Sequence, residues 1–305
     1  MYDLVIVGGG PAGLSAAIYA ARRALKTIVL AKSFGGQTAL NLNIENYPGV
    51  ENISGLDLML TARSQAEKFG AEIADADIKV LARMESGFVI TSAGGKEYRA
   101  KAILLALGRG PRRLGVSDES KFVGKGVAYC ATCDAPLFAG KNVTVVGGGN
   151  SAVDAALLLS KIAKQVYLIV RNGSLTSEAV LVNNLNLANN VKIIYHTGVE
   201  TIKGRDFVES IIVKHLDTGN NEELPTDGIF IEIGYEAKAD FLGNLVDRNA
   251  EGEIIIDSYN RTSMAGIFAA GDVTNVPFKQ AIISAGEGAK AALAIYDYLV
   301  GVVHN

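Results

Sequence analysis

Cysteine is scarce in this chain, with two in 305 residues, so a secreted fold held together by many disulfides is excluded. Charge of one sign is also lacking, because 29 Lys and Arg nearly balance 32 Asp and Glu, giving a formal net charge of −3. This balance gives no electrostatic case for nucleic acid or an anionic membrane as a partner. The composition predicts a soluble, cytoplasmic, globular protein, and the length favours two domains.

Long hydrophobic runs are also few, and the uncharged residues 4–21 are the one stretch that could be a signal peptide or a membrane anchor. The stretch contains Gly8-Gly9-Gly10-Pro11, which would break a spanning helix. No basic residue precedes it, as a signal peptide would require. We therefore expect no membrane segment here.

The two cysteines that are present stand close together, at Cys130 and Cys133. Thiols at this spacing can close and open a small disulfide ring, because one of them can have a depressed pKa and act as the attacking or leaving sulfur. A structural zinc site generally needs about four ligands, and the chain has no second cysteine pair to supply them. A structural disulfide would close almost no loop and so would stabilise little. The spacing therefore predicts a redox-active dithiol.

Asp134 directly follows the second cysteine. Its carboxyl could receive and return protons as thiolates form and leave. It could also cap the turn that begins before Ala135-Pro136, as aspartate often does. The two roles are compatible.

A glycine-rich turn follows the first predicted strand. Residues 4–7 form a short apolar run, Gly8-x-Gly10-x-x-Gly13 follows, and residues 14–21 are predicted to form a helix. Such a turn lets the backbone approach a pyrophosphate, whose charge the helix N-terminus attracts. The next strand, residues 27–30, ends on Ala31-Lys32, where an acidic residue for a ribose hydroxyl is missing.

The same pattern occurs a second time in the chain. The predicted strand 142–146 leads into Gly147-x-Gly149-x-x-Ala152 and an apolar helix over residues 153–159. Two dinucleotide sites in one chain are typical of a flavoprotein that passes hydride between a nicotinamide and a flavin. The alternative is that the second copy is a structural unit that has lost its ligand.

The end of the strand 166–169 does not identify the nicotinamide coenzyme. An NAD site would place an acidic residue near here, and an NADP site would place arginines. Arg171 is a candidate cation for this site, although it could equally be an ordinary exposed arginine.

Several segments together resemble one enzyme family over nearly the whole chain. They are residues 129–138 around the cysteines, 35–37, 45–49, 269–273, 276–281 and 286–291. The sequence resembles the low-molecular-weight thioredoxin reductases, and still more the flavoprotein core of bacterial alkyl hydroperoxide reductase.

The resemblance implies two sets of cofactor-binding residues. Those for FAD are Gly8, Gly10, Pro11, Ala12, Gly13, Gly35, Gly36, Gln37, Asn46, Gly271, Asp272, Lys279, Gln280 and Ala281. Those for the nicotinamide nucleotide are Gly147, Gly149, Asn150, Ser151, Ala152 and Arg171. It further implies that reduced flavin attacks Cys133 and that Cys130 attacks the disulfide of the partner protein.

Two departures from the family pattern bear on the electron donor and acceptor. Members that use NADPH carry His-Arg-Arg-x-x-x-Arg, whereas this chain has Val170, Arg171, Asn172 and Thr176 at those positions. NADH is therefore slightly favoured over NADPH. The hydroperoxide-reductase branch carries a thioredoxin-fold extension before the flavin domain. This chain starts at the flavin fingerprint, so we expect its electron acceptor to be a separate protein.

The resemblance implies two Rossmann-like, doubly wound α/β domains, the second inserted in the first. Residues 1–112 and 243–305 would bind FAD, and residues 113–242 would carry the nicotinamide site and the cysteines. Crossings near residues 110–111 and 234–239 would act as hinges for a rotation that brings the nicotinamide and the disulfide to the flavin in turn. The family also implies a homodimer.

The sequence therefore predicts an FAD-dependent protein disulfide reductase. Electrons would pass from NAD(P)H through flavin and the Cys130/Cys133 pair to thioredoxin or a thioredoxin/glutaredoxin-like protein. One alternative is the same reductase supplied by ferredoxin or a reduced deazaflavin. Another is a flavin redox sensor without turnover.

Overall fold

The computed structural model describes residues 1–41, 44–237 and 239–302. Contacts within the chain divide it into two units, the first comprising Met1–Gly110 and Glu236–Asn305, the second Pro111–Tyr235. The second crossing falls within the expected segment 234–239, a few residues before the expected domain boundary after residue 242. The reason is that Ala239 and Leu242 are buried in the core of the first unit.

The first unit is built on a seven-stranded sheet whose strands run in the order β3-β2-β1-β6-β5-β4, with β17 also paired to β6. Strands β1, β2, β3, β6 and β17 pair in parallel, and β4 and β5 are antiparallel. The strand bounds are β1 Tyr2–Gly9, β2 Thr27–Phe34, β3 Glu72–Asp75, β4 Ile78–Arg83, β5 Phe88–Ser92, β6 Glu97–Leu105 and β17 Ile267–Ala269.

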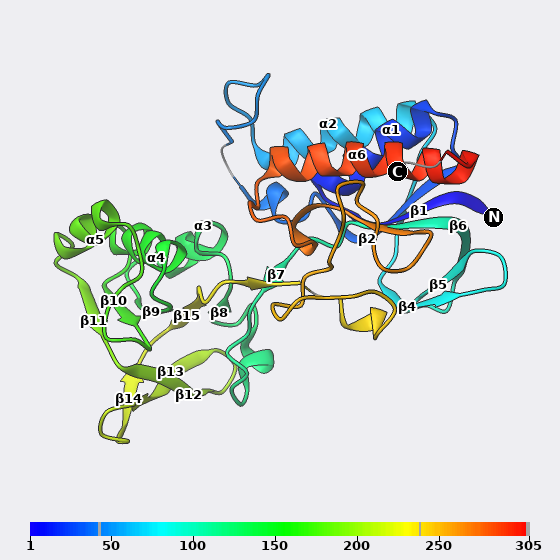
Figure 1. The fold of residues 1–305 in the computed structure, drawn as a ribbon. Helices are drawn as coiled ribbons and strands as arrows, with labels where there is room; N and C mark the ends of the chain where they lie inside the picture. The colour runs from blue at the N-terminus through cyan, green and yellow to red at the C-terminus, as the bar shows by residue number, and fades with distance from the viewer. Residues whose placement is uncertain (42–43, 238, 303–305) are drawn as a thin grey trace. The chain divides into compact units, whose positions relative to one another are not determined.

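Three helices of this unit, α1, α2 and α6, lie together on one side of β1 and β2 (Figure 1). Their bounds are α1 Pro11–Arg22, α2 Gly55–Lys68 and α6 Ala281–Val300. Helices α1 and α6 pack backbone to backbone, because a Cβ on Gly288 would lie 2.0 Å from the Ala12 oxygen. This close packing brings the N-terminal turns of both helices to the same end of the sheet.

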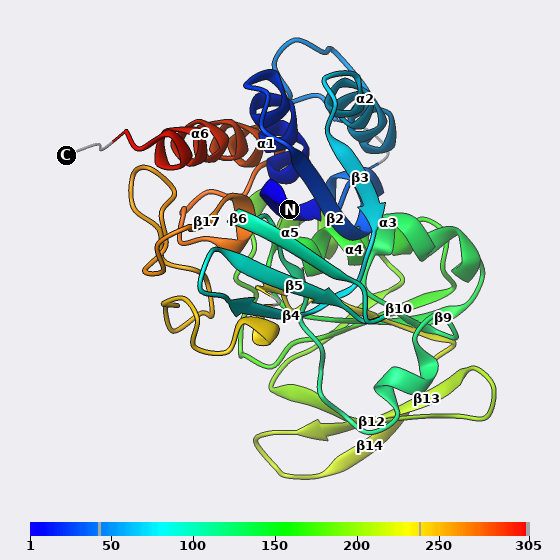
Figure 2. The same ribbon diagram turned by 90° about the vertical axis from the view of Figure 1, so that its right-hand side faces the viewer.

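The second unit contains a five-stranded parallel sheet in the order β11-β10-β9-β15-β8 and an antiparallel sheet β12-β13-β14. One apolar cluster packs α4 and α5 on the parallel sheet, and another packs the antiparallel sheet on it (Figure 2). The bounds are β8 Val127–Ala128, β9 Asn142–Val146, α4 Asn150–Ser160, β10 Gln165–Ile169, α5 Ala179–Asn186, β11 Val191–Ile194, β12 Thr197–Gly204, β13 Val208–His215, β14 Asn221–Pro225 and β15 Gly228–Ile231.

The remaining elements are short. Strands β7 and β16, at the two crossings between the units, pair with each other. Their bounds and those of the short helices are β7 Gly110–Pro111, η1 Thr38–Leu40, η2 Glu119–Phe122, α3 Ala131–Asp134, η3 Ala135–Phe138, β16 Tyr235–Glu236, η4 Asp240–Leu242 and η5 Gly271–Val273. Within the described residues, no helix combines the length and the apolar character needed to cross a membrane.

Both predicted strand-turn-helix units are thus present, as β1-α1 in the first unit and β9-α4 in the second, and the structure has the predicted α/β class with parallel sheets.

Candidate active site

The three glycines of the first fingerprint are required for different physical reasons. Gly8 has φ +118°, and a Cβ there would lie 2.0 Å from the Ala106 oxygen. Gly13 lies on α1, where a Cβ would lie 1.9 Å from the Gly8 oxygen. Gly10 caps α1, and a Cβ on it would meet no atom within 4 Å, so it faces open space. Gly8 and Gly13 therefore hold the turn against strand and helix, and Gly10 leaves room for a ligand.

A cavity of about 1300 Å³ opens at this turn. It exceeds the roughly 300–1,000 Å³ of common ligand pockets, as a dinucleotide would require. The FAD residues expected from the sequence that line it are Gly8, Gly10, Pro11, Ala12, Gly36, Gln37, Asn46, Asp272, Lys279, Gln280 and Ala281. Three others, Gly13, Gly35 and Gly271, are not part of its lining. The last two are turn residues with positive φ.

The cavity joins segments that lie far apart in the sequence. Asn46 donates a hydrogen bond from its side-chain amide to the Gln280 side-chain oxygen at 3.3 Å. Gln280 is the N-cap of α6, whose first turn contains no acidic residue. Asp272 accepts a hydrogen bond of 2.9 Å from Ser284 on the same helix. The N-terminus of α6 thus forms part of the wall, and its unpaired N–H groups can bind a negatively charged ligand.

The acidic residue missing at the end of β2 has a counterpart that the sequence did not reveal. Asp77 precedes β4, lines the cavity, and lies 3.4 Å from the Lys32 ammonium. Lys79 contacts the same carboxylate at 3.0 Å. Hydrogen bonds from these lysines lower the pKa of Asp77. Asp77 therefore places an ionised carboxylate beside Lys32, at the position where the sequence pattern lacks an acidic residue. Only the order of the strands brings the two residues together.

The second fingerprint forms the equivalent turn between β9 and α4. Gly147 has φ +144°, and a Cβ there would lie 2.2 Å from the Glu232 oxygen. Gly149 caps α4, and no side chain caps the helix. Ala152 is fully buried at the position that Gly13 occupies in the first copy, and the neighbouring Ser151 is exposed. The turn has the geometry of a phosphate-binding loop.

Asn150, the first residue of α4, is bound to a loop that the sequence spacing did not identify. Its side-chain oxygen accepts hydrogen bonds from the Ser177 hydroxyl and the Glu178 backbone N–H, both at 2.9 Å. Its amide donates to the Glu178 carboxylate at 3.1 Å. Burial, and then the charge of Glu178, raise the pKa of Asp154 on the same helix. Arg171 is exposed. The charges fixed beside this turn are therefore acidic.

The cysteine pair is a disulfide, with Cα atoms of Cys130 and Cys133 5.4 Å apart. Cys130 is the N-cap of α3, and its sulfur accepts a 3.3 Å hydrogen bond from the Cys133 N–H. Asp134 is the N-cap residue of the following turn, as one reading of the sequence allowed, but its side chain makes no capping hydrogen bond. Burial instead raises the pKa of Asp134. The cysteines and a carboxyl whose pKa is raised by burial therefore share one short segment.

A second carboxyl beside the disulfide was missed by the sequence analysis. Glu232 follows β15 and accepts a 3.4 Å hydrogen bond from the backbone N–H of Ala131, between the two cysteines. Burial raises the pKa of Glu232 to about 7, and the hydrogen bond from Ala131 offsets part of the effect. Its backbone oxygen also packs against Gly147 of the second fingerprint. No sequence signal marks Glu232, because β15 reaches this place only through its pairing with β8 and β9.

Known families, sequences and structures match nearly the whole chain. Residues 2–290 match the pyridine nucleotide-disulphide oxidoreductase family. An alkyl hydroperoxide reductase protein of Pseudomonas putida is 41% identical over 303 residues, which cover 98% of this chain and 58% of that protein. Thioredoxin reductase of Treponema pallidum is 39% identical over 300 residues, covering 98% and 97%. The thioredoxin reductase structure from Lactococcus lactis has a TM-score of 0.87 and 34% identity, covering 99% and 100%. The chain thus spans somewhat more than half the length of the alkyl hydroperoxide reductase relative.

Proposed function

Because the chain belongs to the pyridine nucleotide-disulphide oxidoreductase family, we propose that it is an FAD-dependent protein disulfide reductase that takes electrons from NAD(P)H. Its likeness to thioredoxin reductases over almost their whole length supports this assignment as an oxidoreductase with a cysteine pair. The observation that carries the proposal is the Cys130–Cys133 disulfide, which lies between β8 and β9 of a dinucleotide-type sheet.

The cavity of the first unit fits FAD. Its glycine turn offers open space at Gly10 and the N-terminus of α1, which suit a pyrophosphate. Asp272, Asn46 and Gln280 offer hydrogen-bonding groups along the same wall. Bound FAD would supply the chemistry that converts hydride from a nicotinamide into the electron pair that reduces a disulfide.

The residues beside the disulfide would handle the protons of this reaction. Reducing the Cys130–Cys133 bond consumes two electrons and two protons and gives two thiols, and exchange with the disulfide of a partner protein reverses this change. A carboxyl with a pKa near neutrality can hold and return one of these protons. Asp134 and Glu232 are both close to the cysteines, and burial raises the pKa of each, that of Glu232 to about 7. We assign them this role, with Cys130 and Cys133 as the reacting thiols.

The acidic surroundings of the second fingerprint support NADH over NADPH. The 2′-phosphate of NADPH would require cations here. The fixed groups near the α4 N-terminus are instead Glu178, held by Asn150, and Asp154. Glu178 could accept hydrogen bonds from ribose hydroxyls, as the acidic residue of an NAD site does. Gly147, Gly149, Ser151 and Ala152 would bring the backbone to the pyrophosphate, and Arg171 would remain at the edge of the site.

For the electron acceptor we propose thioredoxin or a thioredoxin/glutaredoxin-like protein. The support is the likeness to thioredoxin reductases, together with a disulfide in which Cys133 is exposed and Cys130 is partly exposed. A dithiol at the surface can form a mixed disulfide with another protein, whereas a buried one cannot.

Anaerobic stopped-flow mixing of FAD-loaded protein with NADH or NADPH tests the proposal. We expect NADH to bleach the visible absorbance of the flavin faster than NADPH. A Cys130→Ser, Cys133→Ser double variant serves as the control, because it should still be bleached but should not reduce thioredoxin. Bleaching of the wild-type protein without electron transfer to thioredoxin would contradict the reductase function.

The same experiment separates a second candidate. The absence of the arginine run around Arg171 also suits a reductase that receives electrons from ferredoxin or a reduced deazaflavin. In that case neither nicotinamide would bleach the flavin, whereas dithionite would do so fully. Reduced ferredoxin would then support the reduction of thioredoxin by the protein.

A further inference from the structure

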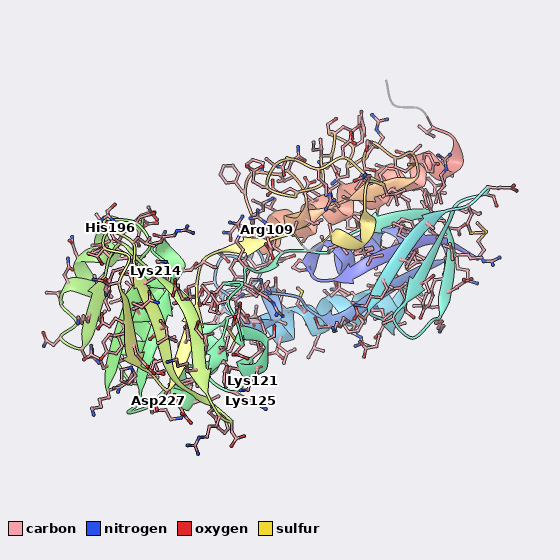
Figure 3. The ribbon with its side chains drawn as sticks, turned by 90° about the horizontal axis from the view of Figure 1, so that it is seen from below. Arg109, Lys121, Lys125, His196, Lys214 and Asp227 are labelled. Atoms are coloured by element: carbon pink, nitrogen blue, oxygen red, sulfur yellow. A yellow bond between two sulfur atoms is a disulfide. The ribbon has the colours of Figure 1, made fainter. Side chains whose placement is uncertain are left out.

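Three charged residues form a partly buried cluster on the wall of the large cavity. The Arg109 guanidinium contacts one oxygen of Glu253 at 2.8 Å, and the Lys279 ammonium contacts the same oxygen at 3.0 Å. The side-chain exposures are 23% for Arg109, 12% for Glu253 and 18% for Lys279. Figure 3 shows Arg109 on the segment that follows β6. The cluster is therefore well removed from solvent. Charges interact more strongly in such a partly buried environment than in water.

Both carboxylate oxygens of Glu253 have partners within the protein. Its first oxygen accepts from both cations, and its second accepts a 2.8 Å hydrogen bond from the Asn249 amide. Burial raises the pKa of Glu253, but the hydrogen bonds and the two cations outweigh this effect and lower it overall. Glu253 is thus ionised at neutral pH, and the cluster has a net charge of one positive unit.

The two cations face the cavity and the anion does not. Arg109 and Lys279 both line the cavity, whereas Glu253 is not part of the lining. The Arg109 Nε atom is buried and finds no acceptor among the residues that the structure describes. A buried donor without an acceptor is unfavourable, so a ligand that supplies one is favoured here.

The cluster and the glycine turn lie on different segments of the cavity wall. The glycine turn and the N-terminus of α1 already provide a site for the pyrophosphate. The cluster belongs to the α6 side of the wall, because Lys279 directly precedes the N-cap Gln280, and its ammonium also donates to the Thr274 carbonyl. Gln280 in turn accepts a hydrogen bond from Asn46.

We infer that Arg109, held with Lys279 by the shared carboxylate of Glu253, is a cofactor-binding residue that favours the reduced, negatively charged form of the flavin. The inference rests on the FAD-dependent function proposed above. Two-electron reduction with uptake of one proton adds one negative charge to the flavin, and a net positive cluster on the cavity wall offsets that charge.

The test is the midpoint potential of the bound flavin, measured anaerobically by dye equilibration. Arg109→Gln removes one cation, and we expect reduced flavin to lose at least about tenfold more affinity than oxidised flavin, a fall of about 30 mV for a two-electron couple. Lys279→Gln removes the other cation, should shift the potential in the same direction, and provides the test if Arg109→Gln does not fold. Arg109→Lys keeps the charge and should retain most of the wild-type potential.

Arg99→Gln is the matched control, because Arg99 is 61% exposed, lies in the same unit and does not line the cavity. Its potential should equal that of the wild type. Unchanged potentials in both cluster variants would overturn the inference. An equal loss of affinity for oxidised and reduced flavin would also overturn the inference, because it would indicate that the cation binds the pyrophosphate. Failure of the wild-type protein to bind FAD, measured by quenching of flavin fluorescence, would instead refute the proposed function.

Discussion

At the scale of single residues, Glu232 illustrates how the tertiary structure changes the chemistry of a side chain. Its carboxyl is partly buried and accepts a hydrogen bond from the backbone N–H of Ala131, while its backbone oxygen packs against Gly147 of the second fingerprint. Burial favours the neutral form, and the pKa rises from the ordinary 4.5 to about 7. Tyr235, whose pKa is raised first by burial and then by the charge of Glu232, lies nearby. Near neutral pH the carboxyl of Glu232 is therefore divided between its protonated and ionised forms, whereas an ordinary glutamate is ionised.

This shift predicts a pH-dependent stability. The folded protein retains the proton of Glu232 up to about pH 7, whereas the unfolded chain releases it near 4.5, so its contribution to stability is lost as pH rises between these values. Glu232→Gln cannot ionise, so its free energy of unfolding should gain on that of the wild type as pH rises. Between pH 5 and pH 8 we expect this gain to be about 1–2 kcal/mol, allowing for partial solvent screening. Urea unfolding of the oxidised protein at both pH values measures the difference.

Glu209→Gln is the control for this prediction, because Glu209 is exposed on β13 in the same unit. Its stability relative to the wild type should not depend on pH. If Glu232→Gln behaves like Glu209→Gln, the carboxyl of Glu232 ionises normally in the folded protein and cannot hold a proton for the cysteines at neutral pH.

At the scale of elements, the two strand-turn-helix units share a turn but differ in how closely the helix approaches it. In β1-α1 the helix residue Gly13 allows the backbone to lie against Gly8. In β9-α4 the corresponding residue is Ala152, whose Cβ is 2.9 Å from the position that a side chain on Gly147 would take. Small residues at these positions set the distance between helix and strand, and the N-terminus of the helix faces outward in both.

Two alanine substitutions in β1-α1 should separate folding from binding. Gly13→Ala places a Cβ 1.9 Å from the Gly8 oxygen, so α1 must move, and we expect a loss of about 1–3 kcal/mol in the free energy of unfolding. Gly10→Ala meets no protein atom within 4 Å and has an ordinary φ of −85°, so the apo protein should keep its stability. Its affinity for FAD should fall about tenfold or more, because the methyl group enters the space of the pyrophosphate.

Thermal unfolding of the apo proteins and titration with FAD measure the two effects. The control is Gly94, which has open space around it and no positive φ. Gly140 also has open space, but its φ of +73° would introduce strain on substitution. Gly94→Ala should therefore match the wild type in both measurements. Full retention of FAD affinity by Gly10→Ala would show that the cofactor does not approach this turn.

At the scale of the whole molecule, the hydrophobic cores follow the division into two units. The two clusters of the first unit contain residues from before position 111 and after position 235. The two clusters of the second unit contain only residues between these positions. Each unit therefore buries its own apolar surface, which is the physical requirement for a domain.

This division predicts that the second unit folds alone. A fragment of residues 111–235 should give a cooperative thermal transition and a circular dichroism spectrum of a mixed α/β protein, because its core is complete. It should also retain a Cys130–Cys133 pair that dithiothreitol reduces. A fragment of residues 111–205 ends before β13, β14 and β15 and serves as the control, since it should not fold. A fragment 111–235 without a cooperative transition would mean that the first unit is needed to complete the core.

Features that depend on local backbone geometry could be predicted from the amino-acid sequence. Both glycine turns and the cysteine pair could be predicted, because φ values open only to glycine and a spacing that permits ring closure are encoded in neighbouring residues. The class of the fold was implied by the resemblance to a known family. The predicted strands and helices were correct in type, and the ends differ, as for the helix expected over 14–21 that spans Pro11–Arg22. The second crossing falls within the expected segment 234–239, but the domain boundary expected after residue 242 lies later than the division at Tyr235/Glu236, because burial of Ala239 and Leu242 is a tertiary property.

Contacts between residues that are distant in the sequence could not be predicted, because they depend on how the elements pack. Asp77 beside Lys32, Glu178 beside Asn150, and Glu232 beside Ala131 have no fixed spacing in the sequence. The order of the strands in each sheet brings them together, and that order depends on packing of the whole unit. The same holds for the charge cluster of Arg109, Glu253 and Lys279. Burial and the proximity of other charges set the protonation of such groups, and neither can be read from a local pattern of residues.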